Sequence, residues 1–175
     1  MRPTVFLDLD DVLVGRGIYN SYQVIQLFEH GTEEWPELWQ GLMHIDAKEN
    51  LKLLHAEFSP LYVISSSWTT QLGREQMILV FERTGLEFVA CNLHEEWTTP
   101  KSKDSSRISE IEAWLGKNSK GEALLILDDH HSGWTLLEST LYQQGKVVIC
   151  DIDRCFVADR LKEARQLLLA QLENN

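Results

Sequence analysis

The chain has 175 residues, enough for one domain with a sizeable hydrophobic core. Its 43% hydrophobic and 25% charged residues are close to globular averages, which excludes disordered, collagen-like and coiled-coil proteins. A formal net charge of -11 argues against a simple DNA-binding module but not against a phosphate-handling site, because a bound divalent cation reverses the local sign of clustered carboxylates.

The N-terminal segment and the cysteines exclude further classes. The apolar stretch over residues 1–14 contains Asp8, Asp10 and Asp11, whereas the core of a secretory signal is uncharged. No apolar run approaches the roughly 20 residues needed to span a bilayer. The three cysteines are odd in number and lack the close pairing of a zinc site, so we expect buried free thiols. These features predict a cytoplasmic protein with no membrane partner.

Short apolar runs alternate with amphipathic stretches in the first half of the chain. Residues 5–7 form an apolar run that ends at acidic residues, which predicts a buried strand. Residues 46–58 carry apolar side chains at helical spacing, and residues 61–64 form a second predicted strand. Another helical period runs over residues 72–85 and ends at a glycine, and residues 86–91 are predicted as a third strand.

The second half of the chain repeats this alternation. A helix is predicted over residues 105–115, with Gly116 as its end. Residues 123–127 and 146–150 are predicted strands, and residues 161–172 form an amphipathic terminal helix. Continuous apolar strands separated by helices predict an α/β fold, a three-layer, Rossmann-like arrangement with helices on both faces of a central, mainly parallel sheet.

Polar side chains follow the predicted strands. Asp8 and Asp10 follow the first strand, and Ser65 follows the second. Asp128 and Asp129 follow the fourth. Ligands of open parallel sheets bind beyond this edge. A single strand-end Asp commonly caps a turn, but a cluster of carboxylates costs Coulomb energy unless a cation neutralises it, and such oxygen ligands suit Mg²⁺.

Basic side chains are expected at the same edge of the sheet. Lys101, Lys103 and Arg107 come just before or inside the helix that leads to the fourth predicted strand. Carboxylates, a hydroxyl and a cation therefore converge there.

These residues and their order resemble the haloacid dehalogenase-like (HAD) superfamily of phosphatases. The first motif of that superfamily, Asp-x-Asp after an apolar strand, is matched by residues 5–13, and the second, an apolar strand ending in Ser or Thr, by residues 61–65. The third is a basic residue near a helix start. The fourth, an acidic pair after an apolar strand, is matched by residues 125–129. The resemblance covers nearly the whole chain and implies a single HAD-like domain over residues 1–175.

A looser resemblance, over residues 65–68, 107–115 and 126–129, is to the HAD domains of Swiss Army Knife RNA repair proteins. The intervals in which this superfamily inserts cap domains, residues 15–44 and 67–101, are too short for one here, so we expect a minimal cap with at most a short helical lid within 15–44. An open site accepts a phosphorylated small molecule, a nucleotide or a nucleic-acid end. The acidic net charge disfavours extended nucleic-acid contacts and places a general phosphatase ahead of an RNA-end phosphatase.

The resemblance implies a Mg²⁺-dependent phosphomonoester hydrolase that acts through an aspartyl-phosphate. Asp8 would attack the phosphoryl group, and Asp10 would protonate the leaving oxygen and then activate water. The Asp8 carboxylate, the Asp10 backbone carbonyl and Asp128 would hold Mg²⁺. Asp129 would bind the ion directly or through water.

The phosphate contacts implied by the resemblance come from hydroxyl and cationic groups. Ser65 would donate a hydrogen bond to a phosphoryl oxygen, helped by backbone N–H groups around Ser66. Lys103 is preferred as the cation because it precedes the amphipathic helix, with Arg107 close behind it and Lys101 third.

Other interpretations of the same residues are open at this point. A response-regulator receiver has a different order of acidic residues, hydroxyl and Lys, so the order disfavours it. A non-catalytic HAD-fold binding or regulatory domain could lose Asp8 or Asp10 at little cost, and the presence of both favours an enzyme. Trp68 either stacks on a base or packs at the start of the next helix. His130 is predicted to be a solvated loop residue or a support for the metal ligands.

Overall fold

Five parallel strands form one sheet within residues 1–31 and 35–173, the parts of the chain that the computed structural model describes. The strand order is β3-β2-β1-β4-β5. The strands are β1 (Thr4–Leu7), β2 (Leu61–Ile64), β3 (Leu93–Thr98), β4 (Leu124–Asp129) and β5 (Val147–Cys150). The predicted α/β, Rossmann-like class is confirmed.

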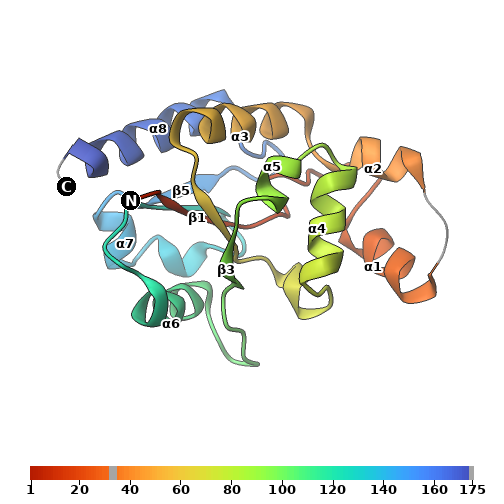
Figure 1. Ribbon diagram of the computed structural model, residues 1–175, viewed down its shortest axis with the longest axis horizontal. Coiled ribbons are helices and arrows are strands. Elements are labelled where there is room, and N and C mark those ends of the chain that lie inside the picture. Colours follow the sequence, from red (N-terminus) through yellow and green to blue (C-terminus); the bar gives the residue numbers. More distant parts are fainter. Residues whose placement is uncertain (32–34, 174–175) are drawn as a thin grey trace.

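Helices connect the strands and cover both faces of the sheet. They are α1 (Ser21–His30), α2 (Pro36–Leu42), α3 (Ile45–Phe58), α4 (Arg74–Arg83), α5 (Glu87–Ala90), α6 (Arg107–Asn118), α7 (Thr140–Gln143) and α8 (Ala158–Glu173). Short 3₁₀ turns occur at Ser67–Thr70 and Trp134–Leu136. In Figure 1, α3 and α8 lie above the sheet and α6 and α7 lie below it. In the described residues, no helix is long and apolar enough to cross a membrane.

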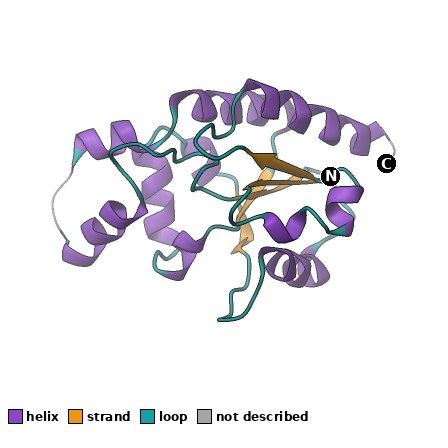
Figure 2. Ribbon diagram, turned by 180° about the vertical axis from the view of Figure 1, so that it is seen from behind, coloured by secondary structure: helices purple, strands orange, loops and turns teal. Residues whose placement is uncertain are grey.

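The strands are apolar throughout because the sheet is buried on both faces. Val5 and Leu7 of β1 point into the core under α3, α4 and α8, whereas Phe6 between them belongs to the second core under α6. Figure 2 shows the same layers from behind, with helices on either side of the strands. The continuous apolar runs of the sequence are therefore the signature of a two-sided sheet.

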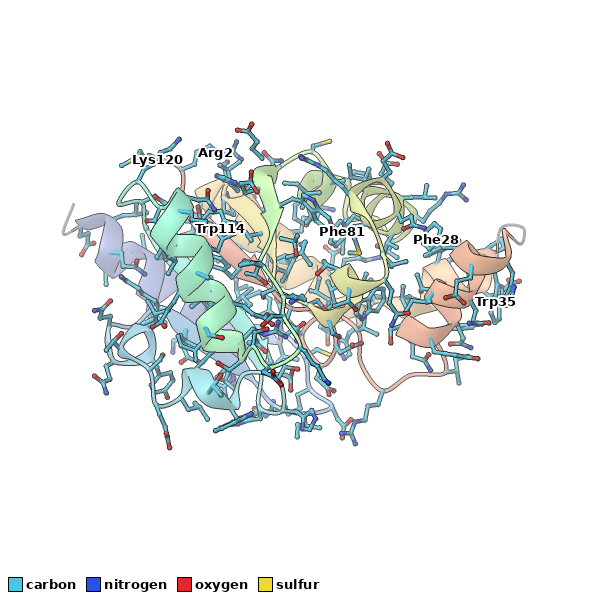
Figure 3. All side chains as sticks on the ribbon, turned by 90° about the horizontal axis from the view of Figure 1, so that it is seen from below. Arg2, Phe28, Trp35, Phe81, Trp114 and Lys120 are labelled. Carbon is cyan, nitrogen blue, oxygen red and sulfur yellow. The ribbon has the colours of Figure 1, made fainter. Side chains whose placement is uncertain are left out.

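Helix α6 is held to the sheet by one large side chain. Trp114 is fully buried, and its ring packs edge-on against Phe6 with the ring centroids 5.1 Å apart. The indole Nε1 donates a hydrogen bond of 2.8 Å to the backbone oxygen of Glu96 next to the sheet edge. Figure 3 shows Trp114 on this helix. The N-terminus of α6 is thereby fixed relative to the ends of the strands.

The strand register determines which residues lie side by side at the carboxyl ends of the strands. Leu7 at the end of β1 pairs with Ile64 of β2 and with Leu127 of β4. The next residue on each strand, Asp8, Ser65 or Asp128, therefore lies at the same carboxyl edge. After β1, the chain adds β2 and then β3 on one side, and it returns to add β4 and β5 on the other side of β1. The topological switch point of the sheet therefore lies at this edge, between β1 and β4.

The third predicted strand is wrong. Residues 86–91 contain the short helix α5, and the strand is β3, over Leu93–Thr98. Strand β3 lies at the edge of the sheet and carries the exposed Glu95 and Glu96, so it lacks the continuous apolar run of a central strand. Gly116 is also not a helix end, because α6 continues to Asn118.

Helices α1 and α2 occupy the interval 15–44, in which a short lid is expected from the sequence; its residues 32–34 lie outside the described ranges. The two helices lie at one end of the molecule, beyond α4 (Figure 1). Trp39 of α2 is buried in the larger core, whereas Trp35 packs edge-on against Tyr19 at a centroid distance of 5.4 Å.

Candidate active site

The turn after β1 presents two carboxylates. The N–H groups of Val12, Leu13 and Val14 all donate to the backbone oxygen of Leu9, which coils the chain into one tight turn directly after Asp8. The apolar residues of this turn are buried, so the core anchors it. Asp8 is buried at the strand end, and Asp10 is partly exposed two residues later.

The last two residues of β4 are the second acidic pair, and the turn after the strand fixes it. Asp129 Oδ1 accepts from the backbone N–H groups of His131 and Ser132, at 2.5 and 3.1 Å. Gly133 N donates to the Asp129 backbone oxygen at 2.9 Å. A Cβ on Gly133 would lie 2.7 Å from that oxygen and 3.1 Å from the Asp128 side chain, so only glycine fits here. The sequence analysis missed Gly133, whose only signal is a glycine four residues after the acidic pair.

Three of these carboxylates meet. Oxygen atoms of Asp8, Asp128 and Asp129 lie within 4.8 Å of one another, and all three residues are buried. Asp8 Oδ2 has no hydrogen-bond partner in the described residues. Buried hard oxygen donors at this spacing fit a Mg²⁺ ion. The Asp10 carboxylate is not part of this group, and its predicted metal contact is through the backbone carbonyl.

Arg107, the first residue of α6, bridges two of the three carboxylates. Its Nε lies 2.7 Å from Asp128 Oδ2 and its Nη2 lies 3.4 Å from Asp8 Oδ1. The side chain is only 7% exposed. Burial alone would lower the pKa of Arg107, but Asp128, Asp8 and Glu110 together raise it. The guanidinium is therefore a permanent positive charge inside the carboxylate cluster.

A second, partly buried cation lies beside the first. Lys101 Nζ pairs with Glu110 Oε2 at 3.0 Å and donates to the Ser65 backbone oxygen at 3.3 Å. Glu110 also accepts from Ser105 Oγ at 2.7 Å, and its Oε2 lies 3.5 Å from Arg107 Nη1. Burial lowers the pKa of Lys101, and the hydrogen bond to Glu110 opposes that change. Glu110, which the sequence analysis did not single out, thus holds both cations at the site.

Lys103 does not belong to this network. It is exposed on the loop between β3 and α6 and makes no hydrogen bond or ion pair with the described part of the chain. Arg107 and Lys101 therefore lie at the carboxyl edge of the sheet, and Lys103, which spacing alone favoured, does not reach their network because it is exposed on the loop before the helix begins.

Two serine hydroxyls complete the arrangement. Ser65 and Ser66 are fully buried at the end of β2, and neither Oγ has a well-aligned hydrogen-bond partner among the described residues. The Ser66 hydroxyl lies beside Asp8, where it opposes the rise in the pKa of that carboxyl. Buried hydroxyls with spare donor capacity are suited to receive an anionic oxygen.

Trp68 contacts the site in a way that the sequence did not indicate. Its indole is buried, so it does not stack on a base, and its Nε1 donates a hydrogen bond of 3.0 Å to Asp10 Oδ2. Burial raises the pKa of Asp10, and the hydrogen bond from Trp68 opposes part of that rise. Asp10 is thus both oriented and biased towards the protonated form.

The pKa values of the buried acids reflect their crowding. Burial raises the pKa of Asp8 well above its ordinary value, Asp128 raises it further, and Arg107 lowers it. Burial raises the pKa of Asp128 to about 7, with Arg107 opposing the rise and Asp129 adding to it. The cluster therefore carries an electrostatic cost that a divalent cation would relieve.

Comparison with known proteins agrees with this geometry. The profile of a family described as the HAD domain in Swiss Army Knife RNA repair proteins matches residues 4–161. No curated protein and no solved structure gives a significant match.

The carboxylate cluster predicts an unusual pH dependence of stability. Because the pKa of Asp128 is about 7 in the folded chain and near 3.8 when unfolded, the folded chain binds more protons between about pH 4 and 7, and the free energy of unfolding falls as the pH rises through this window. In buffer with a chelator, wild type should lose more thermal stability from pH 5 to pH 8 than Asp128→Asn. The exposed Asp104→Asn is the control and should follow wild type. The expected difference is a few °C, since 1 kcal/mol corresponds to about 2–4 °C for a chain of this size; equal pH profiles would contradict this prediction.

Glu110→Gln should destabilise the fold, because it leaves the partly buried Lys101 and the buried Arg107 without their shared anionic partner. We expect a loss of up to about 3–5 kcal/mol in the free energy of unfolding, measured by chemical denaturation. Glu112→Gln, an exposed position on the same helix, should change it by less than about 0.5 kcal/mol. In a double-mutant cycle with Lys101→Met, the combined loss should be smaller than the sum of the two single losses. Additive losses would show that the two side chains are not coupled.

Proposed function

Because the chain belongs to the family of HAD domains found in Swiss Army Knife RNA repair proteins, we propose that it is a Mg²⁺-dependent phosphomonoester hydrolase of the phosphatase type. The observation that carries the proposal is the meeting of Asp8, Asp128 and Asp129 with Arg107 at the switch point of the sheet. A nucleophile, oxygen ligands for a metal and a cation for the phosphoryl group lie together there. A non-catalytic domain would have no need for so costly a cluster.

In the first step, a carboxylate oxygen of Asp8 attacks phosphorus. A bond forms between that oxygen and phosphorus, and the bond between phosphorus and the leaving-group oxygen breaks with its electron pair going to that oxygen. Asp10 gives its proton to the leaving oxygen, which departs as an alcohol. Asp8 Oδ2, which has no hydrogen-bond partner among the described residues, is the oxygen suited to this attack.

In the second step, water attacks the phosphorus of the aspartyl-phosphate. Asp10, now ionised, takes a proton from the water, and the bond between phosphorus and Asp8 breaks to release inorganic phosphate. The Asp8 carboxylate and the protonated Asp10 are restored. The raised pKa of Asp10 suits both roles, because it favours the protonated form that the first step needs and makes the ionised form a stronger base in the second.

Other residues stabilise the negative charge of the transferred group. Arg107 and Lys101 supply positive charge, and the hydroxyls of Ser65 and Ser66 would donate to phosphoryl oxygens. Mg²⁺, held by Asp8, Asp128, Asp129 and the Asp10 carbonyl, would screen the anionic nucleophile from the anionic phosphate. Glu110 and Trp68 act through their neighbours: Glu110 positions the two cations, and Trp68 positions Asp10.

A second candidate is a phosphatase that acts on a nucleic-acid end. The name of the matched family associates its HAD domains with RNA repair proteins. Within 15–44 the described part of the chain holds only the short helices α1 and α2, which leaves the site without a large cap domain. The net charge of -11 still favours a small phosphate ester or a nucleotide over a long polyanion. A panel of sugar phosphates, nucleotides and 3′- and 5′-phosphorylated oligonucleotides separates these substrates.

Asp8→Asn should reduce the hydrolysis of p-nitrophenyl phosphate at least about 10³-fold, because an amide is not a nucleophile. The matched control is Asp11→Asn, the neighbouring acid on the same turn, whose backbone contact to Asp153 an Asn side chain retains. Beryllofluoride with Mg²⁺ should raise the melting temperature of wild type and Asp11→Asn but not of Asp8→Asn. Full activity of Asp8→Asn, or no turnover of any substrate in the panel by wild type, would reject the proposal.

Asp10→Asn should affect the two steps differently. With an alkyl phosphate, whose leaving oxygen needs a proton, the rate should fall by about 10²–10⁴-fold. With p-nitrophenyl phosphate the first step needs no proton, so rapid mixing should show a burst of p-nitrophenolate close to the enzyme concentration, followed by slow turnover. An equal loss with both substrates and no burst would remove Asp10 from the proton-transfer role.

A further inference from the structure

An exposed indole lies on the turn that directly follows the acidic pair at the end of β4. Trp134 is 64% exposed and directly follows Gly133, whose backbone packs against the Asp128 side chain. Because consecutive Cα atoms are about 3.8 Å apart, the Cα atom of Trp134 lies about that far from the Cα atom of Gly133, the residue that packs against Asp128. Trp134 belongs to neither hydrophobic core, so the packing of the fold does not account for an aromatic ring at this position.

The turn holds this indole in a fixed place. Gly133 N donates to the Asp129 backbone oxygen, and Leu136 is buried in the core under α6. Thr135 Oγ1 accepts from the backbone N–H of Ile108, the residue next to Arg107, at 3.3 Å. Strand β4 and the N-terminus of α6 therefore both anchor the turn, and the exposed ring stands on a rigid base between them.

The other exposed aromatic side chains are placed differently. Tyr22 lies on α1, and Trp35 packs against Tyr19 at the end of the molecule formed by α1 and α2, far from Trp114 of α6 in Figure 3. Tyr142 lies on α7, which leads to the opposite edge of the sheet. Among the aromatic residues of the described chain, Trp134 is the one that is both exposed and attached to the turn of the acidic pair.

The charge of the protein favours aromatic recognition over contacts to a phosphate backbone. Two exposed cations on loops of the described chain are paired with acids, Arg16 with Asp153 at 2.8 Å and Arg154 with Asp151 at 3.9 Å, which leaves Lys103 as the exposed cation on the loop before α6. Stacking between a base and an aromatic ring needs no positive charge and tolerates any base. An acidic protein can therefore hold a nucleotide by its base while the metal and Arg107 hold its phosphate.

We propose that Trp134 is a stacking platform for the nucleobase of the substrate, so that the substrate class is a phosphorylated nucleotide or nucleic-acid end rather than a sugar phosphate. This inference rests on the proposed function for the place of the phosphate. The indole binds the base, and the carboxylate cluster with Arg107 and Lys101 binds the phosphoryl group.

The test is a binding measurement that does not depend on turnover. Adenosine 5′-monophosphate and ribose 5-phosphate are titrated, with Mg²⁺, into the Asp8→Asn chain by calorimetry. Trp134→Ala in this background should weaken binding of the nucleotide about tenfold and leave that of ribose 5-phosphate unchanged. Trp134→Phe should retain most of the affinity, and Tyr142→Ala is the control. The affinity ratio of the two ligands should not vary with salt, because the base contact is uncharged.

Further titrations show which nucleotide ligands bind at Trp134 and which results would overturn the inference. Adenosine 3′-monophosphate and a phosphorylated trinucleotide show which nucleotide end the platform accepts, and each should lose affinity in Trp134→Ala. An unchanged ratio of nucleotide to ribose 5-phosphate affinity in Trp134→Ala overturns the inference, as does a Trp134→Ala chain whose only change is weaker self-association in sedimentation. Base-dependent binding without hydrolysis of any ester would instead reject the phosphatase and keep the platform.

Discussion

The crowding of Asp8, Asp128 and Asp129 at the ends of two neighbouring parallel strands is the constraint on which the rest of the structure depends. Strand register brings these carboxylates together, and the two-sided sheet buries them. Like charges at this distance in a poorly solvated place repel strongly, so a compensating positive charge is required. Arg107 provides it from α6, and Trp114 fixes α6 against Phe6 of β1. Packing far from the site thus decides the electrostatics within it.

The ionised carboxylates of the site make the fold less stable. Raised pKa values at Asp8 and Asp128 mean that folding opposes the ionised forms that metal binding would require. Such a cost is typical of active sites and is tolerated where function depends on it. Glu110 limits the cost on the cationic side, since it keeps Lys101 paired while both cations remain close to the carboxylates.

The proposed function and the proposed stacking platform would bring two different forces to bear on a substrate at this edge of the sheet. The phosphate end would meet ionic groups that burial strengthens, and these groups act only over a short range in a protein whose net charge is -11. The base end would meet Trp134, whose attraction is independent of charge. This division would make an acidic surface compatible with an anionic substrate, because recognition of the base avoids electrostatics.

The sequence by itself determined the fold class and the acidic part of the site. Continuous apolar runs such as Leu61–Ile64 indicate strands buried on both faces, and the acids that follow such strands are expected at the carboxyl edge of a parallel sheet. Edge strand β3 escaped this reasoning because one of its sides faces water, which removes the apolar run.

Only the tertiary structure decided which groups surround those acids. Trp68 reaches Asp10 across 58 residues of chain, and Arg107 rather than Lys103 enters the cluster because the loop before α6 turns one side chain inward and the other outward. Position 133 must be glycine because it packs closely against Asp128, and sequence spacing does not predict this contact. Strand ends follow from local pattern, whereas cations, supports and the exposed indole depend on loop conformation and helix packing, which contacts distant in sequence control.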